Sequence, residues 1–556
     1  MLILLAALHV LSGVEGLLQT DAKAVSRNGQ TFVTWKDAAE GEAGAKYRYS
    51  LYRSDRPITK ENPGELCYGG ILNNSAKQFG YAFTIKDRLD PAKPTCILEE
   101  GGTPLPVGSG LAVRTIRKDG KSYYAIVATD ATGKPLGDPA ATGAVDEKVA
   151  PIQPIKLGDS KTRGKYAGSC KITGKKNLPL ALDLHGSNAA GGDAGDHGDL
   201  YLYFGTPEMG WRDGLPGLFT VLERAGVELK FFARDCIENP SGDRAIETCW
   251  FGYFCIPVGA THKEFRAYPF TERRLKWMVT WIIETYGVDP DRVYSRGQSM
   301  GAMGSTQWAF RNPDMFAAVY PRLGRVRQSW LPTVGMPTIN KGRYDKPVPM
   351  EDGVTDYFDR QDSVKWVSEH PEDLPFYAWC YGRNDWVEPW SFQIEMVKAL
   401  TANKHGFALA WNNHGHDSEG ARGMDRLVTH YPSSKFARNQ SYPAFGNSSI
   451  NDNMGNGDKA DGDLEGGINL GFKWSDVVDE PSRWEAKISN DLNKAEMTVD
   501  VTPRRCQKFK AKPGDKFKWT NSAGGSGETA ADAYGRVTVE KVRIKPGEAT
   551  TLTFSK

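Results

Sequence analysis

The stretch Arg292-Val-Tyr-Ser-Arg-Gly-Gln-Ser-Met-Gly301 decides how the middle of the chain folds. Its first four residues are typical of a short buried strand, and residues 302–311 favour a helix that ends at Asn312-Pro313. Glycines on both sides of Ser299 let strand and helix approach closely while the serine takes a strained, exposed conformation. In a chain with 60 glycines the Gly-x-Ser-x-Gly string alone is weak, so the flanking strand and helix carry the interpretation of Ser299 as a nucleophile.

Around this stretch, residues 151–435 alternate apolar strands with long helical segments, which predicts a mostly parallel sheet and an α/β fold class. Residues 178–184 form a continuous apolar run, as expected of a strand buried on both faces. Residues 271–286 place apolar side chains at helical spacing, and Thr271 is the candidate cap. Further strands are predicted at residues 228–233, 292–295, 375–380 and 407–411.

A nucleophilic serine needs a base, and the base needs an acid that orients it. In this kind of sheet both follow the serine in the chain and lie at strand ends. Asp385 comes directly after a predicted strand and is the favoured acid. The competing carboxylates, none of which directly follows a buried-type strand, are Asp345, Asp352, Asp356 and Glu388.

Two histidines follow the last predicted strand of the α/β region. His416 comes after a glycine that frees the loop to carry the ring over Ser299, which favours His416 as the base. His414 lies nearer the strand and would pack against it or line the pocket. The two histidines also form a His-x-His motif, which occurs in some metal sites. No further cluster of ligands accompanies it, so neither a metal nor another cofactor is expected.

An acyl-transfer site also needs N–H donors for the oxyanion. Met300, directly after the serine, is expected to supply one donor, and Gly186 or Ser187 the other, with His185 shaping their loop. Trp386, next to the favoured acid, is a candidate for lining the substrate cleft. Other aromatic candidates, which would otherwise be core residues, are Trp211, Trp250, Phe251, Tyr253, Phe254 and Trp390.

The two ends of the chain are predicted to be all-β. Residues 17–150 show short alternating strands separated by turns, and Trp35 with its Tyr-rich strands resembles fibronectin type III modules. Residues 436–470 are rich in Asn, Asp, Gly and Ser and are predicted to be a linker or long loop. Their acidic residues miss the EF-hand spacing, which favours a solvated loop over a calcium site. Residues 471–556 form a second small all-β region.

Composition and charge narrow the function classes. Met1-Leu-Ile-Leu-Leu at the start of an apolar run predicts a signal peptide over residues 1–16 and therefore secretion. The net charge of +2 gives no footprint for nucleic acid or an anionic membrane, and neither partner is expected. The 8 cysteines fit an oxidising compartment, and the even count permits full pairing without fixing the connectivity. A pair of Cys67 with Cys96 would lie inside the first β region. A stapled loop is expected around Cys236, Cys249 and Cys255.

The elbow and its surroundings resemble a known enzyme family. Asp289-Pro-Asp-Arg292, Gly297-Gln-Ser-Met-Gly301 and Asn312-Pro-Asp-Met-Phe-Ala-Ala318 look like secreted α/β-hydrolase esterases, namely polyhydroxybutyrate depolymerases and feruloyl or acetylxylan esterases. Leu184-His-Gly186 and the His414-Gly-His416 segment are compatible with that family. The resemblance covers about half of the chain and implies a triad of Ser299, Asp385 and His416 that hydrolyses esters through an acyl-enzyme.

The resemblance therefore implies an α/β-hydrolase domain between two small β regions, acting on acylated plant polysaccharide or its fragments. A polyester substrate and a prolyl-oligopeptidase-like peptidase activity are the alternatives within hydrolases. The peptidase usually follows a β-propeller, and no set of repeated blades precedes the α/β region. A non-catalytic carbohydrate-binding protein on the same scaffold is the alternative outside enzymes.

Overall fold

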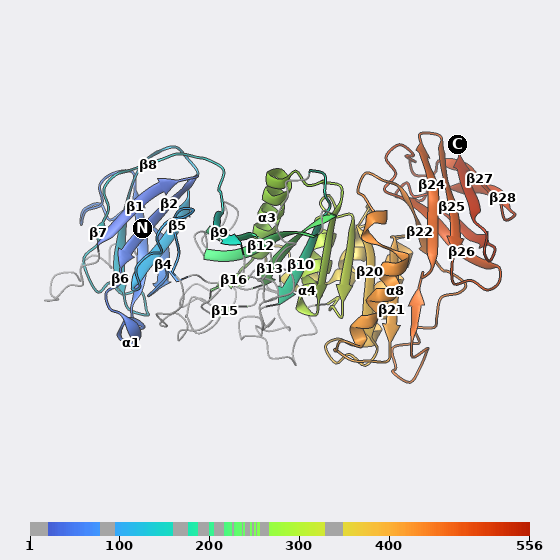
Figure 1. Cartoon of the computed structure of the whole chain (residues 1–556), viewed down its shortest axis with the longest axis horizontal. Coiled ribbons are helices and arrows are strands. Elements are labelled where there is room, and N and C mark those ends of the chain that lie inside the picture. The colour runs from blue at the N-terminus through green and yellow to red at the C-terminus, as the bar shows by residue number, and fades with distance from the viewer. Residues whose placement is uncertain are drawn as a thin grey trace.

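The structure is a computed structural model that describes residues 21–77, 95–159, 176–186, 199–204, 216–224, 227–235, 237–238, 245–246, 250–251, 253–255, 266–327 and 349–556. Figure 1 shows three regions in a row along the long axis, two β regions with an α/β region between them. The expected signal peptide at residues 1–16, Ser187, Trp211 and Asp345 lie outside the described residues, as do Cys170, Cys236 and Cys249.

The first region consists of two antiparallel sheets that share a core. One sheet has the order β1-β2-β5, and the other has the order β4-β3-β6-β7 with β8 also paired to β6. Strand alternation turns Val33 and Trp35 of one sheet toward Tyr49, Leu51 and Ile126 of the other. The fibronectin type III assignment stays a prediction. The elements are β1 (Ala22–Arg27), β2 (Gln30–Lys36), α1 (Gly41–Gly44), β3 (Arg48–Ser54), β4 (Glu65–Leu72), β5 (Ser109–Thr115), β6 (Gly120–Thr129), β7 (Ala140–Ala141) and β8 (Val145–Glu147).

The middle region is built on a ten-stranded sheet of order β23-β21-β20-β19-β18-β10-β13-β12-β11-β9. The six consecutive strands from β21 to β13 are parallel, as predicted. Leu184 of β10 pairs with Gly297 of β18, which aligns the ends of these two strands. The strands are β9 (Ile155–Asp159), β10 (Leu180–Gly186), β11 (Asp199–Phe204), β12 (Pro216–Arg224), β13 (Glu228–Asp235), β18 (Val293–Gln298), β19 (Ala318–Arg322), β20 (Phe376–Gly382), β21 (Phe407–Asn412) and β23 (Gly466–Ile468). Two hairpins, β14 (Ile237–Glu238) with β15 (Ala245–Ile246) and β16 (Tyr253–Cys255) with β17 (Arg266–Tyr268), stand apart from it.

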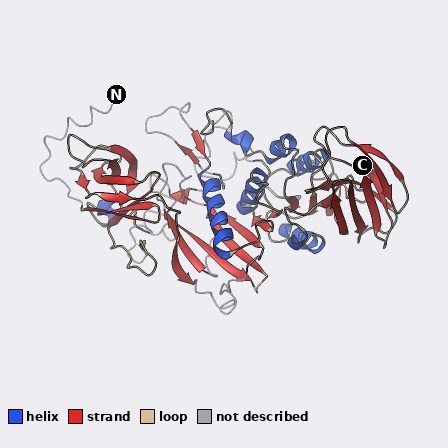
Figure 2. Cartoon of the chain, turned by 90° about the horizontal axis from the view of Figure 1, so that it is seen from above, coloured by secondary structure: helices blue, strands red, loops and turns tan. Residues whose placement is uncertain are grey.

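Helices gather around this sheet (Figure 2). The helical elements are α3 (Phe270–Tyr286), α4 (Met300–Arg311), α5 (Tyr357–Arg360), α6 (Ser363–Glu369), α7 (Trp390–Ala402), α8 (Gly423–His430), η5 (Gly420–Arg422) and η6 (Ser433–Lys435). The expected cap of α3 is wrong, because Pro269 occupies the cap position and Thr271 lies inside the helix. No helix in the described part of the chain is long and apolar enough to cross a membrane.

The two faces of the sheet have different coverings because successive strand residues point to opposite sides. Tyr377 and Trp379 of β20 face a core that includes side chains of α3, α4, α6 and α7. Phe376 and Ala378 face a second core, which α8 shares with the C-terminal β region. The C-terminal region therefore replaces a helical layer on part of this face.

The C-terminal region contains two further antiparallel sheets, of order β22-β26-β29 and β24-β25-β30-β27-β28. The predicted linker at residues 436–470 differs from the structure, since β22 (Tyr442–Gly446) joins the first of these sheets and β23 joins the central sheet. Turn-rich composition hid these strands because each is short. The remaining strands are β24 (Phe472–Glu480), β25 (Arg483–Asn490), β26 (Met497–Arg504), β27 (Lys516–Asn521), β28 (Ser526–Ala530), β29 (Val539–Ile544) and β30 (Thr550–Ser555).

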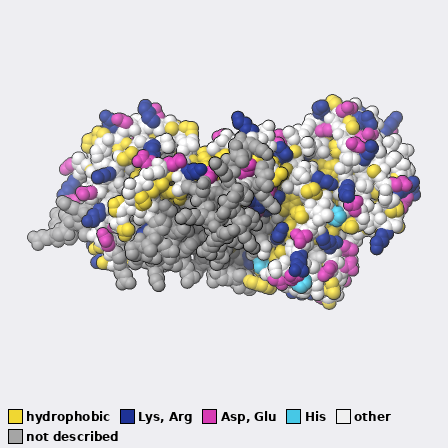
Figure 3. All heavy atoms as spheres, in the orientation of Figure 1, with side chains coloured by type: hydrophobic (Ala, Val, Ile, Leu, Met, Phe, Trp, Pro, Cys, Tyr) yellow, Lys and Arg dark blue, Asp and Glu magenta, His cyan; other side chains and the backbone are white. Residues whose placement is uncertain are grey.

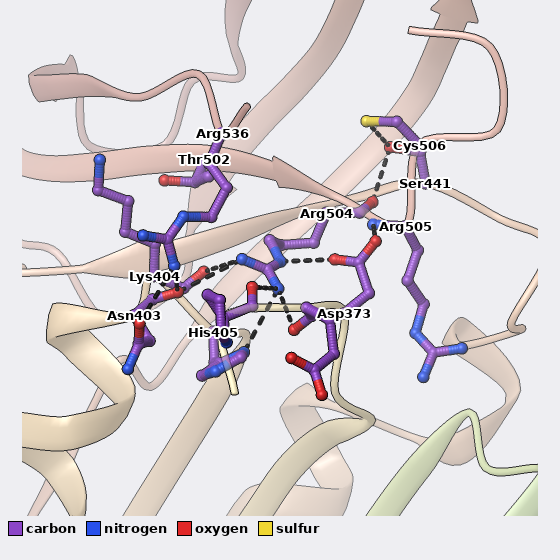
Figure 4. Close-up of polar contacts among 12 residues, drawn as sticks. Asp373, Asn403, Lys404, His405, Ser441, Thr502, Arg504, Arg505, Cys506 and Arg536 are labelled. Carbon is purple, nitrogen blue, oxygen red and sulfur yellow. Dashed lines mark hydrogen bonds and ion pairs between the residues drawn. The ribbon is translucent and has the colours of Figure 1, made fainter. Parts of the chain in front are cut away.

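A buried arginine ties the C-terminal region to the central sheet (Figure 4). Arg504 forms an ion pair with Asp373 at 2.7 Å. Its guanidinium also donates to the carbonyls of Glu372 at 2.7 Å, Pro371 at 3.2 Å and Asn403 at 3.3 Å. The arginine thus fixes the loops at the opposite end of β20 and β21 from Asp385.

The possible Cys67–Cys96 pair is not bonded, because both cysteines are free thiols. The Cys67 sulfur accepts a hydrogen bond from Arg114 at 3.0 Å and packs against the core between the two N-terminal sheets. Cys96 belongs to a different core, shared with β9 and β11. Cys380 and Cys506 are also free, and burial raises the pKa of each thiol to about 12. Figure 3 shows basic and acidic side chains interspersed over both β regions.

Candidate active site

Ser299 lies in a sharp turn between β18 and α4. Its backbone has φ 55° and ψ −120°, a conformation that a residue with a side chain adopts only under constraint. The Ser299 N–H donates to the carbonyl of Arg322 at 2.9 Å, which holds the turn to β19. A Cβ atom on Gly297 would lie 2.3 Å from the backbone of Gly301, so the close approach of strand and helix requires this glycine.

Three side chains form a hydrogen-bonded row at this turn. The His416 Nε2 atom lies 2.7 Å from the Ser299 hydroxyl oxygen. The other ring nitrogen, Nδ1, lies 2.7 Å from the Asp385 carboxylate. The structure therefore brings together the three residues that the sequence singled out, from the turn after β18 and the loops after β20 and β21. An imidazole in this position can take the serine proton while the carboxylate fixes its tautomer.

Asp385 is held in a buried turn after β20. Its side chain has no exposed surface, and its second carboxylate oxygen accepts the backbone N–H of Val387 at 2.8 Å. The competing acids have other roles, since Asp352 and Asp356 cap backbone turns at residues 354–359. The carboxylate beside His416 is thus Asp385.

The loop after β21 that carries His416 (the histidine loop) contacts the loop after β20 that carries Asp385 (the acid loop) through their backbones. The carbonyl of exposed His414 accepts the N–H of Asn384 at 3.0 Å, whereas the ring of His416 reaches the serine. A Cβ atom on Gly382 would lie 2.4 Å from the carbonyl oxygen of His414. The side chain of Asn384 adds a hydrogen bond to the carbonyl of Asn413 at 2.8 Å. Sequence reasoning missed these contacts, although Gly382 and Asn384 come shortly before the candidate acid.

Glu388 is a fully buried carboxyl group three residues beyond the acid. It accepts the backbone N–H groups of Val326 at 3.0 Å and Arg327 at 2.9 Å, and the side-chain amide of Gln393 at 2.7 Å. Burial raises its pKa to about 8, although the two backbone donors oppose that rise. Glu388 therefore connects the acid loop to the loop after β19 and does not contact the histidine row.

Two of the expected oxyanion donors, Met300 and Gly186, lie at neighbouring points of the described backbone. Met300 is the first residue of α4, where backbone N–H groups have no acceptor within the helix. Gly186 ends β10, directly beside the elbow strand, so its backbone lies at the same edge of the sheet as Ser299. Ser187 and the side chain of His185 lie outside the described residues. The described backbone is compatible with an oxyanion site between these two strand ends.

One large aromatic side chain is exposed beside the histidine row. Trp386 is 65% exposed, and its ring lies 6.1 Å from the His416 ring, centroid to centroid, at 64°. Trp250, Phe251 and Trp390 are instead buried core residues. Trp250 explains one glycine of α4, because a Cβ atom on Gly304 would lie 2.2 Å from its indole. Of the described aromatic candidates, Trp386 is placed to meet a substrate.

Among the residues that the structure describes, no group of three His, Cys, Asp or Glu side chains could hold a metal ion.

The middle region has the arrangement of an α/β-hydrolase. It has a parallel sheet, an elbow after β18, and acid and histidine loops at the carboxyl ends of later strands.

Comparisons with known proteins give remote likenesses. No family model matches the chain, and no curated protein sequence does. The fluorophosphonate-binding serine hydrolase F of Staphylococcus aureus is similar over 49% of this chain and 89% of its own, with 11% identity and a TM-score of 0.29. A ferulic acid esterase is similar over 56% and 89%, with 16% identity and a TM-score of 0.27. An S-formylglutathione hydrolase from Staphylococcus aureus is similar over 56% and 91%, with 10% identity and a TM-score of 0.29. Likenesses at this level do not decide the chemistry, which we infer from the geometry of the site.

Proposed function

We propose that the protein is a serine carboxylic-ester hydrolase. The observation that carries this proposal is the row from Ser299 through His416 to buried Asp385, with both contacts at 2.7 Å, at a strained turn where the serine is half-buried. A serine hydroxyl is a weak nucleophile until a neighbouring base removes its proton. The row supplies that base and the acid that orients it.

In the proposed reaction, Ser299 Oγ attacks the ester carbonyl carbon as His416 Nε2 takes the hydroxyl proton. The oxyanion that forms accepts hydrogen bonds from the backbone N–H groups of Met300 and of the end of β10. When the tetrahedral intermediate collapses, the alkoxide leaves with the proton from His416, and the acyl group stays on Ser299. Water then attacks the acyl-enzyme with His416 again as base, which releases the acid and restores the serine.

For the substrate, we propose acylated plant polysaccharide or its fragments, carrying feruloyl or acetyl esters, and a secreted site of action. Exposed Trp386 supports this choice, because an indole face stacks on sugar rings and on aromatic acyl groups. A polyester substrate is the second candidate, since the same indole would contact its apolar chain. A prolyl-oligopeptidase-like activity is less well supported, because the β region before the hydrolase region forms two facing sheets rather than propeller blades.

A fluorophosphonate probe tests the nucleophile. We expect covalent labelling of the native protein and none of Ser299→Ala. Ser305→Ala is the matched control, because Ser305 lies in the same helix but its hydroxyl donates to the carbonyl of Arg296 at 2.6 Å. A folded native protein that takes up no label, or a label that persists in Ser299→Ala, would sink the proposal.

A substrate panel tests the acyl group. Release of acid is measured from acetylated xylan, a feruloylated oligosaccharide, a polyhydroxyalkanoate and a peptide amide. We expect turnover of the polysaccharide esters. Peptide cleavage without any ester turnover would contradict the esterase assignment while leaving the nucleophile intact.

A further inference from the structure

A buried arginine beside the acid is enclosed by a loop that arrives from the C-terminal part of the chain. Arg383 is 1% exposed, and its guanidinium donates to the backbone carbonyls of Asp463 at 2.7 Å and Gly462 at 3.2 Å. The carbonyls of Asp458, Lys459 and Asp461 accept from the same group. The acidic loop at residues 451–465 therefore binds a cation, and that cation is the arginine side chain.

Hydrogen bonds within the loop hold the shape of its backbone. Its carboxylates accept backbone N–H groups of the same loop, Asp463 from Asn453 at 2.7 Å and Asp461 from Asn456 at 2.9 Å. A Cβ atom on Gly455 would lie 2.3 Å from the Asp461 carbonyl oxygen, so the two sides of the loop are in close contact. These acidic side chains thus shape the backbone whose carbonyls hold Arg383.

Two tryptophans of the hydrolase region hold the same loop. The indole N–H of Trp411, on the strand that leads to the histidine, donates to the Asp463 carbonyl at 2.9 Å. The indole N–H of Trp390, at the start of the helix after the acid loop, donates to the Met454 carbonyl at 2.8 Å. The loop at residues 451–465 is therefore hydrogen-bonded to the acid loop, to β21 and to α7, which lies between them in the chain.

Arg383 is also the backbone link between the acid and the base. Its N–H donates to the carbonyl of Asn412 at 2.9 Å, and the next N–H, of Asn384, donates to His414 at 3.0 Å. Asp385 follows directly. A displacement of Arg383 would move the acid relative to the histidine loop, because these bonds are where the two loops meet.

We propose that Arg383 is a positioning residue for the triad, with residues 451–465 as its anchor. In this view the C-terminal part of the chain sets the contact between Asp385 and His416. The inference rests on the proposed esterase function, since it assigns Arg383 a role in that reaction. The hydrogen bonds of Arg383 go to backbone carbonyls and not to the side chains of Ser299 or His416.

Replacement of Arg383 tests this role through kinetics. Loss of the guanidinium in Arg383→Ala is expected to lower kcat by on the order of 10- to 100-fold, with KM changed far less. When Asp385 moves away, His416 loses the contact that orients its ring, so the rate of fluorophosphonate labelling of Ser299 is expected to fall together with kcat. Added guanidinium ion, below denaturing concentration, is expected to restore both kcat and the labelling rate. Arg383→Lys keeps the charge and stem but reaches fewer carbonyls, and a smaller loss of kcat is expected.

Arg504→Ala is the matched control, because Arg504 is another buried arginine that binds backbone carbonyls (Figure 4). Its carbonyl partners lie before β20 and β21, at the opposite end of the sheet from Arg383. Arg504→Ala is expected to lower the melting temperature without changing kcat or the labelling rate. Wild-type kcat in both Arg383 variants, or a melting effect alone, would overturn the inference. If Arg383→Ala does not fold, the kcat and labelling rate of Arg383→Lys decide. A native enzyme without fluorophosphonate labelling would instead reject the proposed function itself.

Discussion

The strained backbone of Ser299 presents the hydroxyl at the start of a helix, where it meets a ring that is already oriented. His416 reaches the serine through one nitrogen and the carboxylate through the other. Because Asp385 is wholly buried, its negative charge has the histidine ring and the Val387 N–H as its contacts. Orientation of the ring therefore depends on the chemistry of this single side chain.

Asp385→Asn is expected to reduce kcat by on the order of 10⁴-fold, because an amide facing Nδ1 favours the wrong histidine tautomer. The size of the residue hardly changes, so the fold should persist in circular dichroism. Asp417→Asn is the control, since exposed Asp417 caps the N–H of Gly420 and an Asn oxygen can do the same. Activity of Asp385→Asn near that of Asp417→Asn would show that His416 has another orienting group.

Trp386→Ala is expected to raise KM for esters that carry a ring and to leave KM for a small acetyl ester nearly unchanged. A stacking contact contributes about 0.5–1.5 kcal/mol, which corresponds to a KM change of roughly 2- to 10-fold. Tyr534→Ala removes an aromatic ring of similar exposure, 63%, from the C-terminal region and serves as control. Equal loss on ring-bearing and small esters would show that Trp386 supports the histidine rather than the substrate.

The sequence was sufficient to place the residues of the row because each follows a strand with a clear apolar pattern. The contacts between the two loops were beyond reach, since Gly382 and Arg383 meet partners about 30 to 80 residues away in the chain. Such pairings depend on how strand ends are brought together, which no local pattern encodes.

At the scale of elements, the elbow depends on how closely β18 and α4 approach. Gly297→Ala would place a methyl group within the backbone of Gly301, at 2.3 Å. Relief of that clash requires the helix to shift, at a cost of about 1–3 kcal/mol, and moves Ser299 away from His416. We expect a lower melting temperature and a slower rate of fluorophosphonate labelling.

Gly143→Ala is the control for this change, because nothing lies within 4 Å of a Cβ atom there. Unchanged labelling in Gly297→Ala would mean that the elbow tolerates a wider separation of strand and helix than the structure shows.

The buried carboxyl of Glu388 gives the elements around the acid loop a pH dependence. Its folded pKa of about 8 lies above the ordinary carboxyl value of 4.5, so the folded protein binds this proton more tightly than the unfolded chain. The contribution to stability is full below the ordinary value and is lost as pH rises toward 8. Within that window the slope is at most about −1.4 kcal/mol per pH unit.

Urea unfolding between pH 5 and 8 measures this slope. We expect Glu388→Gln to show a flatter dependence than the wild type, and Glu369→Gln, at an exposed carboxyl, to match the wild type. Identical slopes in all three proteins would mean that Glu388 is ionised when folded, stabilised by its backbone donors.

Elements with a strong apolar period were predicted within a few residues of their bounds, as for α3 and the parallel strands. Short strands in a polar context were not, because β22 and β23 are specified by their partners in two different sheets. The possible Cys67–Cys96 disulfide does not form for a related reason, since the two cysteines lie in one region but in separate cores.

At the scale of the whole molecule, the three regions share their cores. Phe32 and Val113 of the first region pack with Leu202 and Phe204 of the sheet edge. At the other end, the apolar side chains of one sheet face pack with strands of the C-terminal region. The three regions are therefore expected to unfold together in one cooperative transition rather than independently of one another.

A chain that stops after residue 440 tests this dependence. The truncation would uncover Phe376, Tyr431 and Phe436, whose rings pack against removed aromatic rings and which are each no more than 2% exposed in the full chain. An apolar surface of this kind favours aggregation, so we expect the truncated protein in the insoluble fraction. A soluble truncated protein that melts cooperatively would show that the hydrolase region is independent.

The short strand β23 has a consequence for self-association. It pairs antiparallel with Leu409, Ala410 and Trp411, so the strand that leads to His416 has a neighbour on each side. Without β23, that strand would present open N–H and C=O groups and become a template for a strand from another molecule. Because β23 is synthesised after β22, the edge of β21 stays unpaired until late in synthesis. A nascent chain that lacks residues 466–468 is thus the form most exposed to intermolecular β-pairing.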